Sequence, residues 1–77
     1  MKTISLVEMR ENQKGRVAEI EGGLALRQRL MGLGIYPGLH VLRLSHFALK
    51  GPVMIRVGRS TLALGHSMAG KIKVSLE

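Results

Sequence analysis

The segment VMIRVGRSTLAL, residues 53–64, carries the clearest secondary-structure pattern in the sequence. Its first five residues alternate Val, Ile and Val with other side chains, which is the period of a half-buried β-strand. Gly58 and Arg59 separate this run from a second one, Ser60–Leu64. A two-residue connection that begins with glycine favours a type II′ turn. The segment therefore predicts a β-hairpin.

Further short strands are expected on both sides of this hairpin. They are predicted near residues 4–6, 16–21, 39–45 and 72–76. A polar stretch, residues 11–15, favours a turn between the first two strands. The spacing of three between the apolar anchors of the second strand, positions 17 and 20, fits period two only if a β-bulge lies between them. Short strands in succession imply antiparallel pairing.

One amphipathic helix is expected between these strands, over residues 24–33. Leu26, Leu30 and Leu33 lie at spacings of four and three and are predicted to form an apolar stripe that covers the sheet. Gly34 is placed to adopt the left-handed conformation that closes a helix, and the proline three residues later prevents the helix from resuming. A single helical turn is expected at residues 67–69.

The chain has the size of one small domain, because 77 residues bury only about 60% of the surface that the unfolded chain exposes. Five or six short strands and one helix in this length predict a mainly β fold, a small and partly open barrel with the helix packed across it. We expect residues 1–77 to form this single domain.

The composition excludes several protein classes. With 45% hydrophobic and 22% charged residues, the chain is not expected to be disordered. The absence of Cys removes disulfides and thiolate metal sites. The longest stretch without Lys, Arg, Asp or Glu, residues 30–42, is shorter than the roughly 20 residues of a membrane span. We therefore expect no membrane insertion and a cytoplasmic location.

The net charge of +7 favours nucleic acid, an anionic membrane surface or an acidic protein as partner. No two basic residues are adjacent, so the charge does not form the cluster typical of a dedicated nucleic-acid arm. Tyr36 and Phe47 are the only aromatic residues, too few for a base-stacking platform. The sequence predicts a solvated basic surface and no specific nucleic-acid binding.

Catalysis and a dedicated metal site are both poorly supported. The chain lacks Cys and Asp, and the adjacent His66 and Ser67 do not by themselves place a nucleophile against an oriented base. His40, His46 and His66 form no HxH or HxxxH pair, so no two of them are set on one strand or helix face as metal ligands. We predict a protein that is not an enzyme and has neither a metal site nor a cofactor.

The decapeptide RLMGLGIYPG, residues 29–38, followed by Val41, resembles the RLxxLGxxPG signature of the FeoA family. Gly51-Pro52, residues 62–64, and Ala69 with Ile72 and Val74 resemble further elements of the family pattern. Gly65 is a departure, since relatives often carry Arg there. The resemblance implies an SH3-like barrel, similar also to the C-terminal module of DtxR-type repressors.

The resemblance further implies a small accessory protein of bacterial ferrous iron uptake. Such a protein acts with the membrane GTPase transporter FeoB and is peripheral to the inner membrane through this partner. Two other functions stay open at this point, direct binding of a transition metal ion and nucleic-acid binding by an SH3-like barrel. Self-association through a sheet edge also stays open.

The helix is the first candidate for a partner-docking surface. Arg27 and Arg29 are expected to project from its polar side, and Leu24 or Met31 to supply apolar contact. Basic side chains beside exposed apolar atoms suit an acidic or mixed partner surface. The loop over residues 45–52 is the next candidate.

Overall fold

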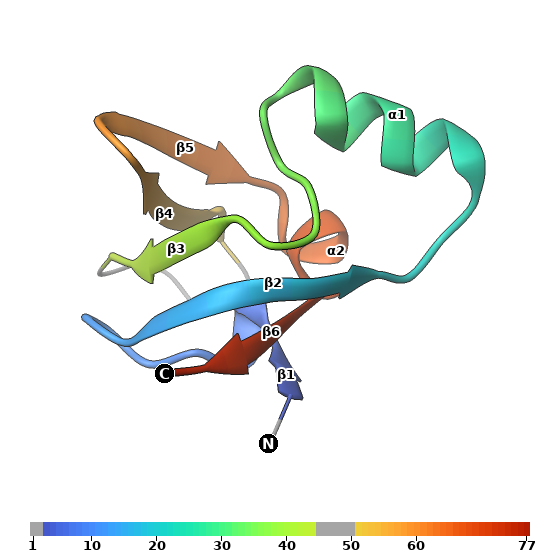
Figure 1. The fold of residues 1–77 in the computed structure, drawn as a ribbon. Coiled ribbons are helices and arrows are strands. Elements are labelled where there is room, and N and C mark those ends of the chain that lie inside the picture. The colour runs from blue at the N-terminus through green and yellow to red at the C-terminus, as the bar shows by residue number, and fades with distance from the viewer. Residues whose placement is uncertain (1–2, 45–50) are drawn as a thin grey trace.

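The computed structural model describes residues 3–44 and 51–77. Within these ranges six strands form one antiparallel sheet in the order β1-β6-β2-β3-β4-β5, which curls into a partly open barrel (Figure 1). The strands are β1 (Thr3–Ser5), β2 (Lys14–Ile20), β3 (His40–Arg43), β4 (Val53–Val57), β5 (Ser60–Leu64) and β6 (Ile72–Leu76). The predicted mainly β barrel is confirmed.

The hairpin formed by β4 and β5 is the one predicted from the sequence. The two strands pair in register from Val57 with Ser60 to Val53 with Leu64. Gly58 has a φ of 61°, whereas Arg59 has no positive φ, which is the pattern of a type II′ turn. Only the first turn position therefore needs the conformational freedom of glycine.

Strand β2 begins earlier than expected, because Lys14 and Gly15 belong to it and not to the preceding turn. Both residues pair with β3, and Gly15 is buried. The turn is confined to the residues before them, where Asn12 has a φ of 66°. The pairing of β2 with β6 shifts register between Val17 and Glu19, which confirms the predicted bulge.

The first strand ends one residue earlier than predicted, because Leu6 lies in a 3₁₀ turn, η1 (Leu6–Glu8), and not in β1. A capping box at Ser5 sets this boundary. The Glu8 N–H donates to Ser5 Oγ at 3.4 Å, and the Ser5 N–H donates to Glu8 Oε1 at 3.0 Å. Leu6 is nevertheless fully buried, so its predicted apolar role is kept.

Helix α1 (Leu24–Gly32) connects β2 to β3 and is close to the predicted range. Leu30 is fully buried and Leu26 is partly buried against the core, but Leu33 is 46% exposed, so its prediction as a core residue is wrong. Leu33 follows the last helical residue, and the chain then turns through Gly34, whose φ of 89° confirms the predicted left-handed closure. Ile35 fills the core position instead.

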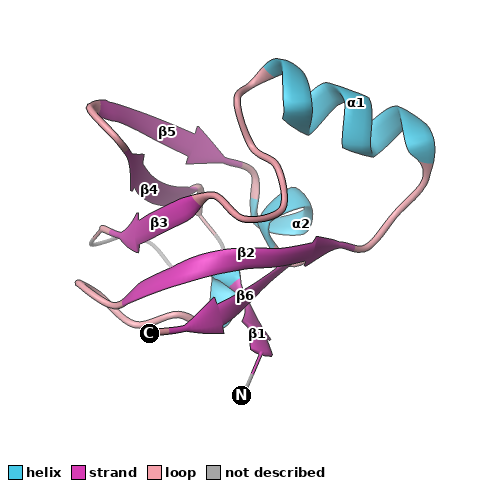
Figure 2. Ribbon diagram, in the orientation of Figure 1, coloured by secondary structure: helices cyan, strands magenta, loops and turns pink. Residues whose placement is uncertain are grey.

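The helices and strands are arranged around one apolar core. Figure 2 shows α1 standing out from the strands, with loops on both sides, and α2 (His66–Ala69) between β5 and β6. The core contains buried apolar side chains from five strands, both helices, η1 and two loops: Leu6, Met9, Val17, Ile20, Leu30, Ile35, Val41, Val53, Ile55, Leu64, Ala69, Ile72 and Val74.

Arg43 is a charged residue that is almost completely buried at the end of β3. Its Nη1 donates to the Leu44 carbonyl oxygen at 2.8 Å and to the Met54 carbonyl oxygen at 3.5 Å. Burial lowers the pKa of the guanidinium below its ordinary value, and the negative charge of Glu11 opposes that shift. These contacts tie the end of β3 to β4.

Helices in residues 3–44 and 51–77 are all too short or too polar to cross a membrane. The predicted strand over residues 39–45 is observed as His40–Arg43, and its last predicted position, Ser45, lies outside the described residues.

Candidate functional site

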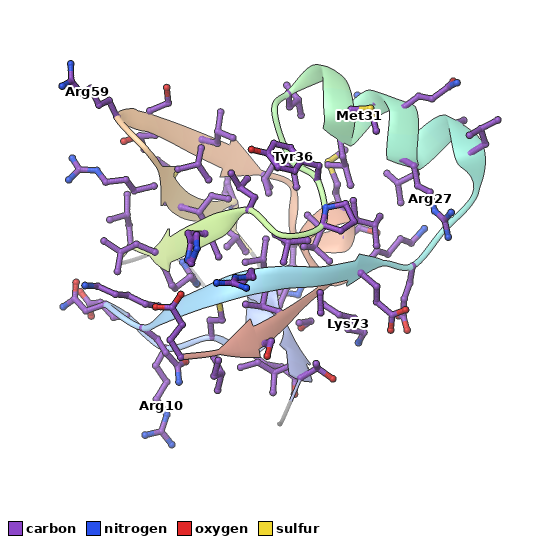
Figure 3. The ribbon with its side chains drawn as sticks, in the orientation of Figure 1. Arg10, Arg27, Met31, Tyr36, Arg59 and Lys73 are labelled. Carbon is purple, nitrogen blue, oxygen red and sulfur yellow. The ribbon has the colours of Figure 1, made fainter. Side chains whose placement is uncertain are left out.

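The four residues predicted to bind a partner lie along helix α1. Leu24 and Met31 are 70% and 62% exposed, and Arg27 and Arg29 are also exposed. Leu24, Arg27 and Met31 occupy positions i, i+3 and i+7, which places them on one helix face. Arg29 lies outside this series. Figure 3 shows Arg27 and Met31 on α1 and Tyr36 on the segment that follows it.

A groove of about 380 Å³ lies beside this face of α1. Its volume falls within the roughly 300–1,000 Å³ of typical ligand sites. Two of the predicted residues, Arg27 and Met31, line it, whereas Leu24 and Arg29 do not. The remaining lining comes from β2 and from the segment after α1: Ala18, Glu19, Ile20, Ile35, Tyr36 and Pro37.

The bulge in β2 contributes to the lining of this groove. Ala18 and Glu19 are consecutive residues, yet both are exposed, whereas a regular strand directs successive side chains to opposite faces. A bulge re-aims side chains in this way and is common beside functional sites. The irregular apolar spacing at positions 17 and 20 signalled the bulge, but sequence reasoning did not connect it with the helix.

The segment after α1 supplies the apolar end of the groove. Ile35 N–H donates to the Leu30 carbonyl oxygen at 2.9 Å, and Gly38 N–H donates to the Val17 carbonyl oxygen at 2.7 Å. These bonds hold the segment between α1 and β2 and leave Tyr36 47% exposed. The sequence analysis singled out Tyr36 only as an aromatic residue for base stacking, so its place at the groove was missed.

The lining of the groove is mostly apolar and carries few ionisable groups. Its only ionisable groups besides the Tyr36 hydroxyl are Glu19 and Arg27. Exposed aromatic and methionine side chains beside an Arg are enriched at protein interfaces. The chemistry of the lining therefore suits a partner with apolar and charged contacts.

The histidines considered as metal ligands do not come together in the part of the chain that the structure describes. His40 Nδ1 is 2.7 Å from Glu77 Oε1, and its Nε2 is 3.3 Å from Arg16 Nη2. His66 begins α2, and His46 lies outside the described residues, as does Phe47. Residues 3–44 and 51–77 contain no group of three or more potential metal ligands.

The chemistry of Arg16 and Glu77 sets the direction of their two hydrogen bonds with His40. An Arg side chain only donates, so Nε2 accepts from Arg16, and a carboxylate only accepts, so Nδ1–H donates to Glu77. Both ring nitrogens are occupied by contacts within the chain.

Comparison with known proteins identifies the family. The FeoA domain model matches residues 4–76. A crystal structure of an iron uptake regulatory protein (FeoA) is 34% identical, with each chain covered completely and a TM-score of 0.88. The solution structure of a FeoA-like protein from Clostridium acetobutylicum is 26% identical, with 99% of this chain and 88% of that chain covered and a TM-score of 0.86.

A more distant similarity concerns the fold alone. A manganese-dependent transcriptional repressor is 21% identical over 97% of this chain and 42% of its own, with a TM-score of 0.87. No curated protein sequence matches the chain significantly. The family match and the structural similarity bear out the SH3-like barrel that the signature implied. The chain belongs to the FeoA domain family.

Proposed function

We propose that this chain is a non-catalytic accessory protein of ferrous iron uptake that docks on the cytoplasmic side of a FeoB-type GTPase transporter. The family match supports a role in iron transport, and the resemblance of residues 29–38 to the FeoA signature supports the choice of transporter. The protein is then peripheral to the inner membrane through this partner, without a cofactor of its own.

One observation carries the choice of docking surface. The large apolar side chains that are exposed in the described residues all fall within residues 24–36: Leu24 at 70%, Met31 at 62%, Tyr36 at 47% and Leu33 at 46%. Isolated exposed apolar residues are ordinary, but their concentration in α1 and the four residues after it supports an interaction site there. We call these four residues, with Arg27 and Arg29, the α1 surface.

The charge of the α1 surface indicates the chemistry of its partner. Residues 22–44 contain no Asp or Glu, whereas Arg27 and Arg29 lie beside the exposed apolar side chains. An apolar and basic surface is complemented by an apolar and acidic one. We therefore expect the transporter to present an acidic, partly apolar face to α1.

The experiment compares acidic substitutions on the α1 surface with an acidic substitution elsewhere. The test variant is Arg27→Glu/Met31→Glu, and the matched control is Arg10→Glu, an exposed position far from α1 in Figure 3. Both should melt near the wild-type temperature, because substitutions of exposed residues usually change stability by less than about 0.5 kcal/mol. Thermal melting checks this before any binding assay.

Co-purification with the tagged transporter and ferrous uptake in cells lacking the native protein are then measured. The α1 variant should lose both, and the control should keep both. Arg29→Glu reports whether the flank away from the groove also takes part. A folded Arg27→Glu/Met31→Glu variant that binds and complements like wild type would show that docking does not use the α1 surface.

A further inference from the structure

Strand β5 is an edge of the sheet that lacks the usual protection against strand addition. It pairs with β4, and within residues 3–44 and 51–77 no strand pairs with its other side. Proteins protect such edges with charged side chains, proline, bulges or very short strands. β5 has the sequence STLAL and pairs with β4 without a register shift. The opposite edge, β1, has only three residues.

The hydrogen bonds of β4 show which backbone groups of β5 face the open side. Leu44 N–H donates to the Met54 carbonyl oxygen at 2.9 Å, so Met54 uses its backbone groups toward β3. Residues alternate between the two sides of an antiparallel strand, so Ala63, the register partner of Met54, does not bond to β4. The same holds for Thr61. The N–H and C=O groups of Thr61 and Ala63 therefore face outward.

The side chains around this edge define what an added strand would carry. Cross-strand partners share a face of the sheet, so Thr61 lies beside the exposed Arg56 on the outer face. Arg59, in the adjoining turn, is also exposed (Figure 3). On the inner face, Leu62 is only partly buried against the core. An added strand would meet basic groups on one face and apolar atoms on the other.

We propose that the β5 edge binds an extended, antiparallel segment of a partner protein in which acidic and apolar residues alternate. Acidic residues lie opposite Thr61 and Ala63, near Arg56 and Arg59, and apolar residues cover Leu62. Backbone hydrogen bonds supply affinity and the alternating side chains supply specificity, as in strand addition generally. A second copy of this chain is disfavoured, because both copies carry a net charge of +7.

This site goes beyond the docking function proposed above and shares no residue with the α1 surface. It can be tested with peptides and without a transporter. The probes are the capped peptide Glu-Val-Glu-Val-Glu-Val-Glu and its counterpart with Lys in place of each Glu. Binding is followed by NMR titration of ¹⁵N-labelled protein, which detects weak complexes residue by residue.

The test variant is Ala63→Pro, and the matched control is Ala63→Ser. Proline is tolerated on an edge strand where the N–H faces solvent, so A63P should fold while losing an outward donor. We expect the acidic peptide to shift the amide signals of Thr61 and Ala63 and to bind more tightly than the basic one. A63P should weaken binding at least about tenfold, the equivalent of roughly one hydrogen bond, and A63S should not.

Methylated peptides test the register. The residues opposite Thr61 and Ala63 turn their N–H groups toward β5, so N-methylation of the Glu residues should abolish binding and N-methylation of the Val residues should not. Equal binding of the acidic and basic peptides, or unchanged signals at Thr61 and Ala63, would overturn the proposal. Sedimentation that shows self-association abolished by A63P would assign the edge to a second copy instead. Arg27→Glu/Met31→Glu should bind the peptide normally.

Discussion

Gly15 of strand β2 packs tightly against strand β6. A Cβ added at this position would collide with the Val74 side chain and lie 3.0 Å from the Ser75 carbonyl oxygen. Gly65 is the opposite case, because a Cβ there would meet no atom within 4 Å and its φ is −56°. Two glycines of one small barrel therefore have different physical reasons to be present, and only the first is required by packing.

Substitution of these two glycines should separate their roles. Gly15→Ala should destabilise the fold by about 1–3 kcal/mol, the usual cost of overpacking a filled interior. Gly65→Ala should be neutral or stabilise by up to about 1 kcal/mol, because it reduces the freedom of the unfolded chain at a compatible position. Urea denaturation of both variants measures the difference. If the Gly15→Ala and Gly65→Ala variants unfolded at the same urea concentration, β2 and β6 would have to move apart to accept the methyl group at position 15.

Gly65 is also the position at which this sequence departs from the FeoA family pattern. A Cβ at this position would meet no atom within 4 Å, so the backbone accepts a side chain there. The position lies between the end of β5 and the start of α2. Packing therefore does not require glycine at this position.

Helix α1 places few of its nine residues in the core. Leu30 is its only fully buried side chain, and Gly23 at its N-terminus makes no side-chain cap. Helices shorter than about 12 residues are marginal alone in water, so α1 depends on Leu30 and on the closure at Gly34. Because α1 buries so little, two of its other large apolar residues, Leu24 and Met31, remain exposed.

Two glycines near the end of α1 should respond in opposite directions to the same substitution. Gly32 is the last residue of α1, and a Cβ there would meet no atom within 4 Å. Gly32→Ala should therefore stabilise the fold by about 0.5–1 kcal/mol. Gly34 has a φ of 89°, so Gly34→Ala should destabilise by roughly 1–2 kcal/mol through backbone strain. Thermal melting compares the pair. A stabilising Gly34→Ala would show that the helix can close in another way.

The whole molecule distributes its net charge of +7 over an open barrel. Exposed basic residues lie on β2 (Lys14 and Arg16), on α1 (Arg27 and Arg29) and at the β4–β5 hairpin (Arg56 and Arg59). They lie on several elements of the fold, although Lys14 and Arg56 line the same pocket. Such a distribution steers acidic partners toward the protein without selecting a base sequence.

Association with nucleic acid should accordingly be weak, independent of sequence and strongly dependent on salt. Phosphate contacts release counterions, so affinity should fall steeply between about 50 and 200 mM salt. Fluorescence anisotropy with two DNA duplexes of unrelated sequence measures both effects. A complex that prefers one duplex and survives physiological salt would contradict this expectation and favour a nucleic-acid-binding barrel.

Local patterns in the sequence were sufficient to predict most of the helices and strands. The alternation at Val53–Val57 and the glycine at position 58 predicted the hairpin, because side-chain period and turn conformation are properties of neighbouring residues. The same reasoning placed α1 and the bulge in β2. It failed at Gly15 and Leu6, where pairing with β3 and the Ser5 capping box decide the local structure.

Some features of the candidate site follow from local sequence, and others depend on tertiary structure. The sequence by itself determined that α1 carries Leu24, Arg27, Arg29 and Met31 on a helix, because helical spacing is local. Tertiary structure alone decided that Leu33 is exposed, that Arg27 and Met31 meet the β2 bulge and Tyr36 in one groove, and that β5 is an open edge. These features depend on where distant segments come to rest, and only the burial of one common core settles those positions.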